Sequence, residues 1–145
     1  GTAEGGTVGS LKPKLTVSGG IVSTAGITPD TRYPWGQCTW WAATRRADIG
    51  KPIPGWGNAA TWAGSAASAG YTVDGSPSAG SVIVFQPGVL GASADYGHVA
   101  MVEEVRGDGS ILISESNALG LGVVSTREIS ASQLAAAGNG VRYIH

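Results

Sequence analysis

The spacing of apolar residues changes about half-way along the chain, and this change predicts two kinds of element. In the first half, the pattern predicts helices over residues 38–48 and 59–69. The first predicted helix ends near Gly50. The second follows Asn58, a favourable N-cap residue, and ends at Gly70.

The second half of the chain has short apolar runs separated by turn residues, which is typical of strands. The predicted strands cover residues 81–85, 98–105, 110–116, 123–129 and 141–145, with a short helix at about 131–137. A turn at 106–109, with the sequence RGDG, separates two of them. Helices followed by an antiparallel sheet predict an α+β fold with N-terminal helices packed on the sheet.

Residues 1–28 differ from the rest because they are rich in Gly, Ser and Thr. They alternate only weakly, over 14–18, so we expect a linker or N-terminal extension with at most one short strand. The composition changes at Pro29, and residues 29–145 are expected to form one folded domain. The first residues lack an initiator Met and a signal pattern, which predicts a tag remnant, a processed end or a piece of a longer chain.

The charge balance argues against nucleic acid as a partner. Nine Lys and Arg residues stand against ten Asp and Glu residues, for a formal charge of −1. With this balance, and with Arg45-Arg46 as the basic doublet, nothing in the sequence suggests a phosphate-tracking surface. No run approaches the roughly 18 consecutive apolar residues of a membrane span.

Cys38 is the single cysteine of the chain. It is therefore a buried packing residue, an intermolecular partner or a nucleophile. Its place at the start of a predicted helix favours a nucleophile, because the unpaired N–H groups and the positive end of the helix dipole stabilise a thiolate. Gly36 just before it permits a sharp turn.

A thiolate needs a base, and the two histidines are His98 and the C-terminal His145. Terminal residues usually fray, so His98, at the start of a predicted strand, is the candidate base. An imidazole also needs a group that orients it. Glu115 is the first polar residue on the face of the predicted strand that carries Ile111 and Ile113, and Asn117 shares that face if the strand continues.

These residues lie in blocks that resemble the CHAP domain, the cysteine, histidine-dependent amidohydrolase/peptidase family. The blocks are YPWGQCTWWA (33–42), GNA (57–59) with Trp62, Pro77 with Gly80, GHVAMVE (97–103) and ISESN (113–117). They occur in order over about residues 29–145, and together they are highly specific.

The resemblance implies a papain-like α+β fold and hydrolysis of amide bonds in bacterial peptidoglycan. It implies that Cys38 is the nucleophile, that His98 is the base, that Glu115 orients the imidazole and that Asn117 is a further polar member of the site. Three residues beside the nucleophile are candidates for oxyanion or substrate contacts: Tyr33, Gln37 and Trp41.

No cofactor or metal is expected. Some phage relatives carry an Asp-rich calcium loop before the cysteine, whereas here that segment holds Asp30 alone, too few oxygen ligands for calcium. The chain is expected to be the monomeric catalytic domain of a larger protein that is secreted or associated with the cell wall.

Several functions remain open from the sequence. The enzyme could be an N-acetylmuramoyl-L-alanine amidase or a cross-bridge endopeptidase. Alternatives are an amidase for a small soluble thiol or polyamine amide, and a non-catalytic module that tethers or organises the wall. The presence of Cys38, His98, Glu115 and Asn117 together argues against a degenerate site.

Overall fold

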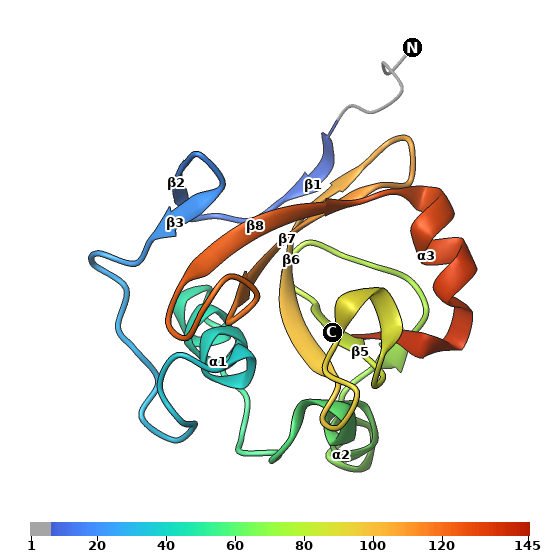
Figure 1. The fold of residues 1–145 in the computed structure, drawn as a ribbon, viewed down its shortest axis with the longest axis horizontal. Helices are drawn as coiled ribbons and strands as arrows, with labels where there is room; N and C mark the ends of the chain where they lie inside the picture. Colours follow the sequence, from blue (N-terminus) through green and yellow to red (C-terminus); the bar gives the residue numbers. More distant parts are fainter. Residues whose placement is uncertain (1–6) are drawn as a thin grey trace.

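An antiparallel sheet forms the centre of the computed structural model, which describes residues 7–145 (Figure 1). Its strands run in the order β2-β3-β8-β7-β6-β5-β9-β4, and β1 pairs separately with β6. The strands are β1 (Thr7–Ser10), β2 (Thr16–Ser18), β3 (Ile21–Ser23), β4 (Val73–Asp74), β5 (Val82–Phe85), β6 (His98–Arg106), β7 (Ile111–Ser116), β8 (Val124–Ile129) and β9 (Val141–Ile144).

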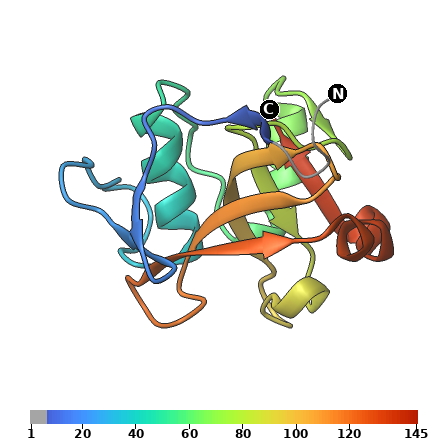
Figure 2. The ribbon, with the colours of Figure 1, turned by 90° about the horizontal axis from the view of Figure 1, so that it is seen from above.

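Helices lie on both sides of this sheet. They are α1 (Cys38–Asp48), α2 (Trp62–Ser68) and α3 (Ala131–Ala137), with single 3₁₀ turns η1 (Ala59–Thr61), η2 (Val89–Gly91) and η3 (Gly138–Gly140). Figures 1 and 2 show α1 and α3 on opposite sides of the strands. The prediction of an α+β fold is confirmed. None of the helices among residues 7–145 is long and apolar enough to cross a membrane.

Both faces of the sheet are buried, because alternate residues of its central strands enter two different clusters. Val82 and Val84 of β5 pack with the buried residues of α1 and α2. Ile83 and Phe85 point to the other face, where partly buried residues of α3 and η2 cover the second cluster. β5 is therefore a continuous apolar run, whereas β6 and β7 begin or end with polar residues beside their buried apolar ones.

The first predicted helix matches α1, and its sequence explains where it ends. Gly50 has a φ of 77°, and the N–H groups of Gly50 and Lys51 donate to the carbonyls of Ala47 and Arg46. Paired bonds of this kind with a left-handed glycine form a Schellman motif, which satisfies the last carbonyls of a helix. The nucleophile candidate thus begins a helix with a defined end.

The second predicted helix, over 59–69, is shorter than expected. Residues 59–61 form the 3₁₀ turn η1, and the α-helix begins only at Trp62. Asn58 occupies the N-cap position of η1, but its side chain makes no capping hydrogen bond. Gly70 does end the helix, with a φ of 92°. The prediction that the Asn58 side chain caps a helix is therefore wrong.

The prediction of at most one short strand before residue 28 is also wrong. Three short strands lie there: β1 pairs with the end of β6, β2 pairs with β3, and β3 continues the sheet beside β8. Leu11 and Val22 enter the first core cluster. The partners of β1 in β6 and of β3 in β8 lie about 100 residues away, so local alternation gave no sign of these pairings.

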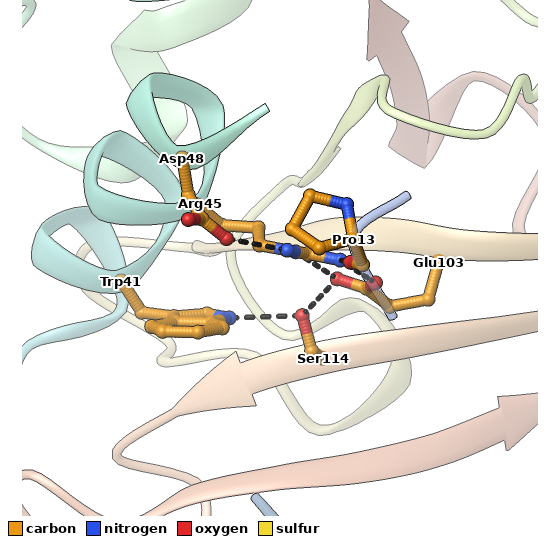
Figure 3. A network of polar contacts seen from close by, with 6 residues as sticks. All are labelled: Pro13, Trp41, Arg45, Asp48, Glu103 and Ser114. Carbon is orange, nitrogen blue, oxygen red and sulfur yellow. Dashed lines mark hydrogen bonds and ion pairs between the residues drawn. The ribbon is translucent and has the colours of Figure 1, made fainter. Parts of the chain in front are cut away.

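A buried polar network joins this N-terminal segment to α1 and to the centre of the sheet (Figure 3). The Arg45 guanidinium, from α1, donates to both carboxylate oxygens of Glu103 at 3.1 and 2.8 Å, to Asp48 at 2.6 Å and to the Pro13 carbonyl at 2.7 Å. Ser114 of β7 donates to Glu103 at 2.8 Å. Each charged group is therefore paired, which burial requires.

We expect Glu103→Ala to lower the free energy of unfolding by about 3–5 kcal/mol, because it leaves the fully buried Arg45 without its bidentate partner. The matched control is Glu128→Ala, which removes an exposed carboxylate that pairs with Arg106 and should lower it by less than about 1 kcal/mol. Urea unfolding of both variants checks this, and equal losses would contradict a structural role of the buried pair.

Candidate active site

Cys38 is the first residue of α1, and a tight turn delivers the chain to it. Gly36 is buried with a φ of 82°, and a Cβ atom there would lie 2.7 Å from the backbone nitrogen of Gly122. The Gly36 carbonyl accepts hydrogen bonds from Gly122 N at 3.0 Å and from Ser116 Oγ at 2.7 Å. The turn is therefore held against the β7–β8 loop, and only glycine fits it.

The surroundings of Cys38 favour a thiolate. Burial alone would raise the pKa of the thiol, but the hydrogen bond and the charge of His98, with the backbone N–H groups of Val99 and Thr39, lower it below its ordinary value. Thr39 N–H belongs to the first turn of α1, where backbone donors have no partner within the helix. The prediction that the helix start stabilises the thiolate agrees with this geometry.

His98 begins β6 and lies between the thiol and a carboxylate. Its Nε2 atom is 2.9 Å from Oε1 of Glu115, so Nδ1 is the nitrogen that remains for the thiol. Burial lowers the pKa of His98, but the hydrogen bonds to Cys38 and Glu115 outweigh it and raise this pKa to about 9. A protonated imidazole beside a thiolate is the arrangement that these two opposite shifts describe.

Glu115 is buried near the end of β7, on the face that carries Ile111 and Ile113, as the alternation predicted. Burial would raise the pKa of its carboxyl, but the His98 hydrogen bond and the Arg127 charge lower it. The carboxylate therefore stays ionised at neutral pH. It can fix the imidazole tautomer and balance a positive charge on His98.

Arg127 of β8 is a member of this site that the sequence analysis missed. Its Nε and Nη2 atoms donate to the two oxygens of Glu115, both at 3.0 Å, and Nη1 donates to the Leu90 carbonyl at 2.9 Å. Its guanidinium carbon also lies 5.6 Å from the centre of the Phe85 ring. The sequence did hold one sign of this role: Arg127 lies two positions before Ile129 in the predicted strand, so a basic side chain shares the face of a buried apolar residue.

Asn117 lies at the site but does not share the face of Glu115. Strand β7 ends at Ser116, and Asn117 adopts a φ of 65°. Its Nδ2 atom donates to Oε1 of Gln37 at 3.1 Å. Because Asn117 occupies the amide oxygen of Gln37, the NH₂ group of Gln37 is the part that can donate to a bound molecule beside Cys38.

Of the two aromatic candidates, Tyr33 lies beside Cys38 as expected and Trp41 does not. Trp41 is fully buried, and its indole N–H donates to Ser114 Oγ at 2.9 Å, so the prediction that it contacts substrate is wrong. It lies one turn after Cys38 and faces the core. Tyr33 is also mostly buried: its hydroxyl donates to the Pro54 carbonyl and accepts from Trp56 N. Its ring does line a hollow beside Cys38.

A groove with two lobes opens at Cys38. One lobe, of about 560 Å³, is lined by His98 and is called the His98 lobe. The other, of about 520 Å³, is lined by Tyr33 and is called the Tyr33 lobe. Four residues line both lobes: Gln37, Cys38, Tyr96 and Gly97. The candidate nucleophile therefore stands at the junction, open to a molecule that extends both ways.

The second histidine is engaged elsewhere. Nδ1 of His145 lies 2.7 Å from Ser78 Oγ, and its Nε2 lies 2.7 Å from Asp74 Oδ1. The backbone of His145 is also bonded to Thr72, so the expectation that this terminal residue frays is wrong. With both ring nitrogens occupied, His145 is not available as a base for the thiol.

Metal-binding side chains do not gather in the part of the chain from residue 7 to residue 145. Within it, no group of three or more His, Cys, Asp or Glu side chains could hold a metal ion.

The chain is similar in sequence to known cell-wall enzymes of Staphylococcus aureus. The chain is 46% identical over 115 residues to a probable autolysin, SsaALP, of Staphylococcus aureus, covering 79% of this chain and 40% of that protein. It is 40% identical over 147 residues to the N-acetylmuramoyl-L-alanine amidase sle1 of the same organism, covering 91% of this chain and 41% of that protein. The chain thus spans well under half the length of these relatives.

A crystal structure of an N-acetylmuramoyl-L-alanine amidase from Staphylococcus aureus superposes with a TM-score of 0.73 at 41% identity, covering 79% of this chain and 31% of that one. The model of the CHAP domain family matches residues 28–117, which include Cys38, His98, Glu115 and Asn117. Its match ends at Asn117, before Arg127. This chain belongs to the CHAP domain family.

Proposed function

We propose that this chain is the catalytic part of a larger peptidoglycan hydrolase that cleaves the amide bond between N-acetylmuramic acid and L-alanine. The catalytic residues lie in 29–145, and the strands before residue 28 support them. The observation that carries this proposal is the continuous chain of contacts from Cys38 through His98 to Glu115, which opens into a groove. The relatives named as amidases support the choice of bond. A cross-bridge endopeptidase is the alternative outcome of the test below.

The proposed reaction begins with attack by the Cys38 thiolate on the amide carbonyl carbon. The carbonyl oxygen becomes an oxyanion, which the first N–H groups of α1 and the NH₂ group of Gln37 stabilise. The intermediate collapses as the C–N bond breaks and the nitrogen takes a proton from the His98 imidazolium. A free amine leaves, and the acyl group remains on sulfur as a thioester.

Hydrolysis of the thioester uses the same residues in reverse. Neutral His98 takes a proton from water as the water oxygen attacks the thioester carbon. The C–S bond then breaks, which releases a carboxylic acid and restores the thiolate beside the imidazolium. Throughout the cycle Glu115 holds Nε2 of His98 and balances its charge, while Arg127 holds Glu115.

We also propose that bacterial peptidoglycan is the partner and that the protein acts outside the cell, secreted or associated with the wall, with this domain as a monomer. Peptidoglycan lies outside the membrane, so a hydrolase must reach it there. The autolysin and amidase names of the relatives support this location.

We expect Cys38→Ala to fold and bind walls but to lose at least about 10³-fold in the rate of sacculus hydrolysis, because the covalent nucleophile is gone. Mass spectrometry of fragments from purified sacculi gives the bond. New amino-terminal L-alanine together with free muramic acid carboxylate indicates an amidase, whereas new cross-bridge termini indicate an endopeptidase. Substantial lysis by Cys38→Ala would contradict the thiol mechanism.

The pH dependence of Cys38 alkylation should reveal its partnership with His98. The thiol pKa lies below its ordinary value of 9.0, so the thiolate persists to lower pH. We expect the midpoint of iodoacetamide labelling against pH to lie below 9.0 in the wild type. In His98→Ala it should move upward, because burial then acts without the opposing imidazolium.

His145→Ala is the matched control for that experiment, since both ring nitrogens of His145 bond to other groups. It should leave the midpoint of labelling unchanged. An equal upward shift in both histidine variants would mean that His98 is not the specific partner of the thiol.

Glu115→Gln should reduce kcat/KM by about 10²- to 10⁴-fold, because a neutral amide neither balances imidazolium nor fixes its tautomer. Asn117→Gly should lose only about 10-fold or less, since it removes one hydrogen bond to Gln37 and glycine accepts the positive φ. Steady-state kinetics on a soluble muropeptide compares the two. The reverse order would assign the orienting role to Asn117.

A further inference from the structure

The two lobes of the groove differ in their access to the proton donor. Cys38 lines both lobes, whereas His98 lines only the lobe that bears its name. The Tyr33 lobe is instead lined by a loop and the start of η1, including Gly55, Gly57 and Asn58. A bound amide that spans the junction must therefore place one side toward the imidazole and the other side away from it.

The position of the leaving nitrogen determines which part of the substrate lies in which lobe. When the C–N bond breaks, this nitrogen must take a proton from the His98 imidazolium, at a hydrogen-bond distance of about 2.6–3.2 Å. The nitrogen and the group attached to it then lie in the His98 lobe. The carbonyl carbon is bonded to Cys38, so the acyl group extends into the Tyr33 lobe.

The linings fit this orientation. The Tyr33 lobe combines the rings of Tyr33 and Pro34 with two exposed polar side chains, Arg32 and Asn58, and Asn58 makes no capping bond to its own 3₁₀ turn. Such groups suit the acetamido and hydroxyl groups of a sugar. The His98 lobe combines Ala118 and Leu119 with the hydroxyl groups of Ser93, Ser125 and Thr126, and Glu115 and Arg127 also line it. This lining suits a short peptide that begins with alanine.

We infer that the N-acetylmuramoyl group lies in the Tyr33 lobe, where Asn58 bonds to the sugar, and that the stem peptide lies in the His98 lobe against Leu119. This inference rests on the function proposed above. It gives the groove a direction: the acyl-enzyme keeps the sugar in the Tyr33 lobe, and the departing peptide empties the His98 lobe for water.

A variant–substrate cycle tests the direction with Asn58→Ala and Leu119→Ala. Both side chains are exposed, so neither substitution should affect folding. The substrates are an N-acetylmuramoyl pentapeptide, the same peptide carrying only a D-lactoyl group, and N-acetylmuramoyl-L-alanine amide. The first is complete, the second lacks the sugar, and the third lacks the peptide beyond L-alanine. The quantity measured is kcat/KM for each pair.

With the complete substrate, each variant should lose roughly 2- to 10-fold in kcat/KM, the effect of one lost contact. The loss in Asn58→Ala should disappear with the D-lactoyl peptide and persist with the alanine amide. The loss in Leu119→Ala should follow the opposite pattern. In single turnovers, Asn58→Ala alone should also change the rate of thioester hydrolysis, because the peptide has already left.

The exchanged pattern, or losses that do not depend on which part of the substrate is missing, would overturn the inference. These outcomes require a wild type that cleaves the complete substrate. If the wild type, with Cys38 reactive to iodoacetamide, cleaves none of the three, the proposed bond itself is wrong, and that result is distinct from a reversed direction.

Discussion

The buried bond between Arg45 and Glu103 is the constraint on which the rest of the molecule depends. It joins α1, which carries Cys38, to β6, which carries His98. The same carboxylate accepts from Ser114, which directly precedes Glu115 in β7 and also accepts the indole N–H of Trp41 (Figure 3). One ionic contact thus ties together the elements that hold the thiol, the imidazole and the carboxylate.

A bidentate bond suits this task better than apolar packing would. Apolar side chains can slide or repack at small energetic cost, whereas a guanidinium and a carboxylate in a buried setting must stay in register or leave a charge unpaired. The Pro13 carbonyl accepts from the same Arg45. The segment before residue 28 therefore belongs to the structural support of the site, although the family model begins only at residue 28.

Much of this arrangement could be predicted from sequence, where local signals were sufficient. The helix start at Cys38, the strand start at His98 and the face of Glu115 all follow from local pattern. Strand β1 did not, because its stability comes from pairing with the far end of β6. The prediction for Trp41 failed because a position near Cys38 in the sequence does not fix the direction of a side chain. The Trp41 indole is fully buried and bonds to Ser114 of the sheet.

Arg127 shows a different limit, since its role depends on register. It lies opposite Ile113, two residues along from the pairing of Glu115 with Ser125, and only this register brings its guanidinium onto the Glu115 carboxylate. With Arg127 on Glu115, four charges of alternating sign follow one another: the Cys38 thiolate, the His98 imidazolium, the Glu115 carboxylate and the Arg127 guanidinium. Each partly buried charge then has a neighbour of opposite sign, so the ion pair of Cys38 and His98 can form without an uncompensated charge.

The bond from Arg127 to the Leu90 carbonyl extends this electrostatic chain into the wall of the groove. Leu90 lines the His98 lobe and has a φ of 50°, an unfavourable conformation for leucine. The guanidinium that helps His98 to keep Glu115 ionised therefore also holds a loop that lines the His98 lobe. Arg127 therefore affects both the charge beside the His98 imidazole and the shape of the lobe next to it.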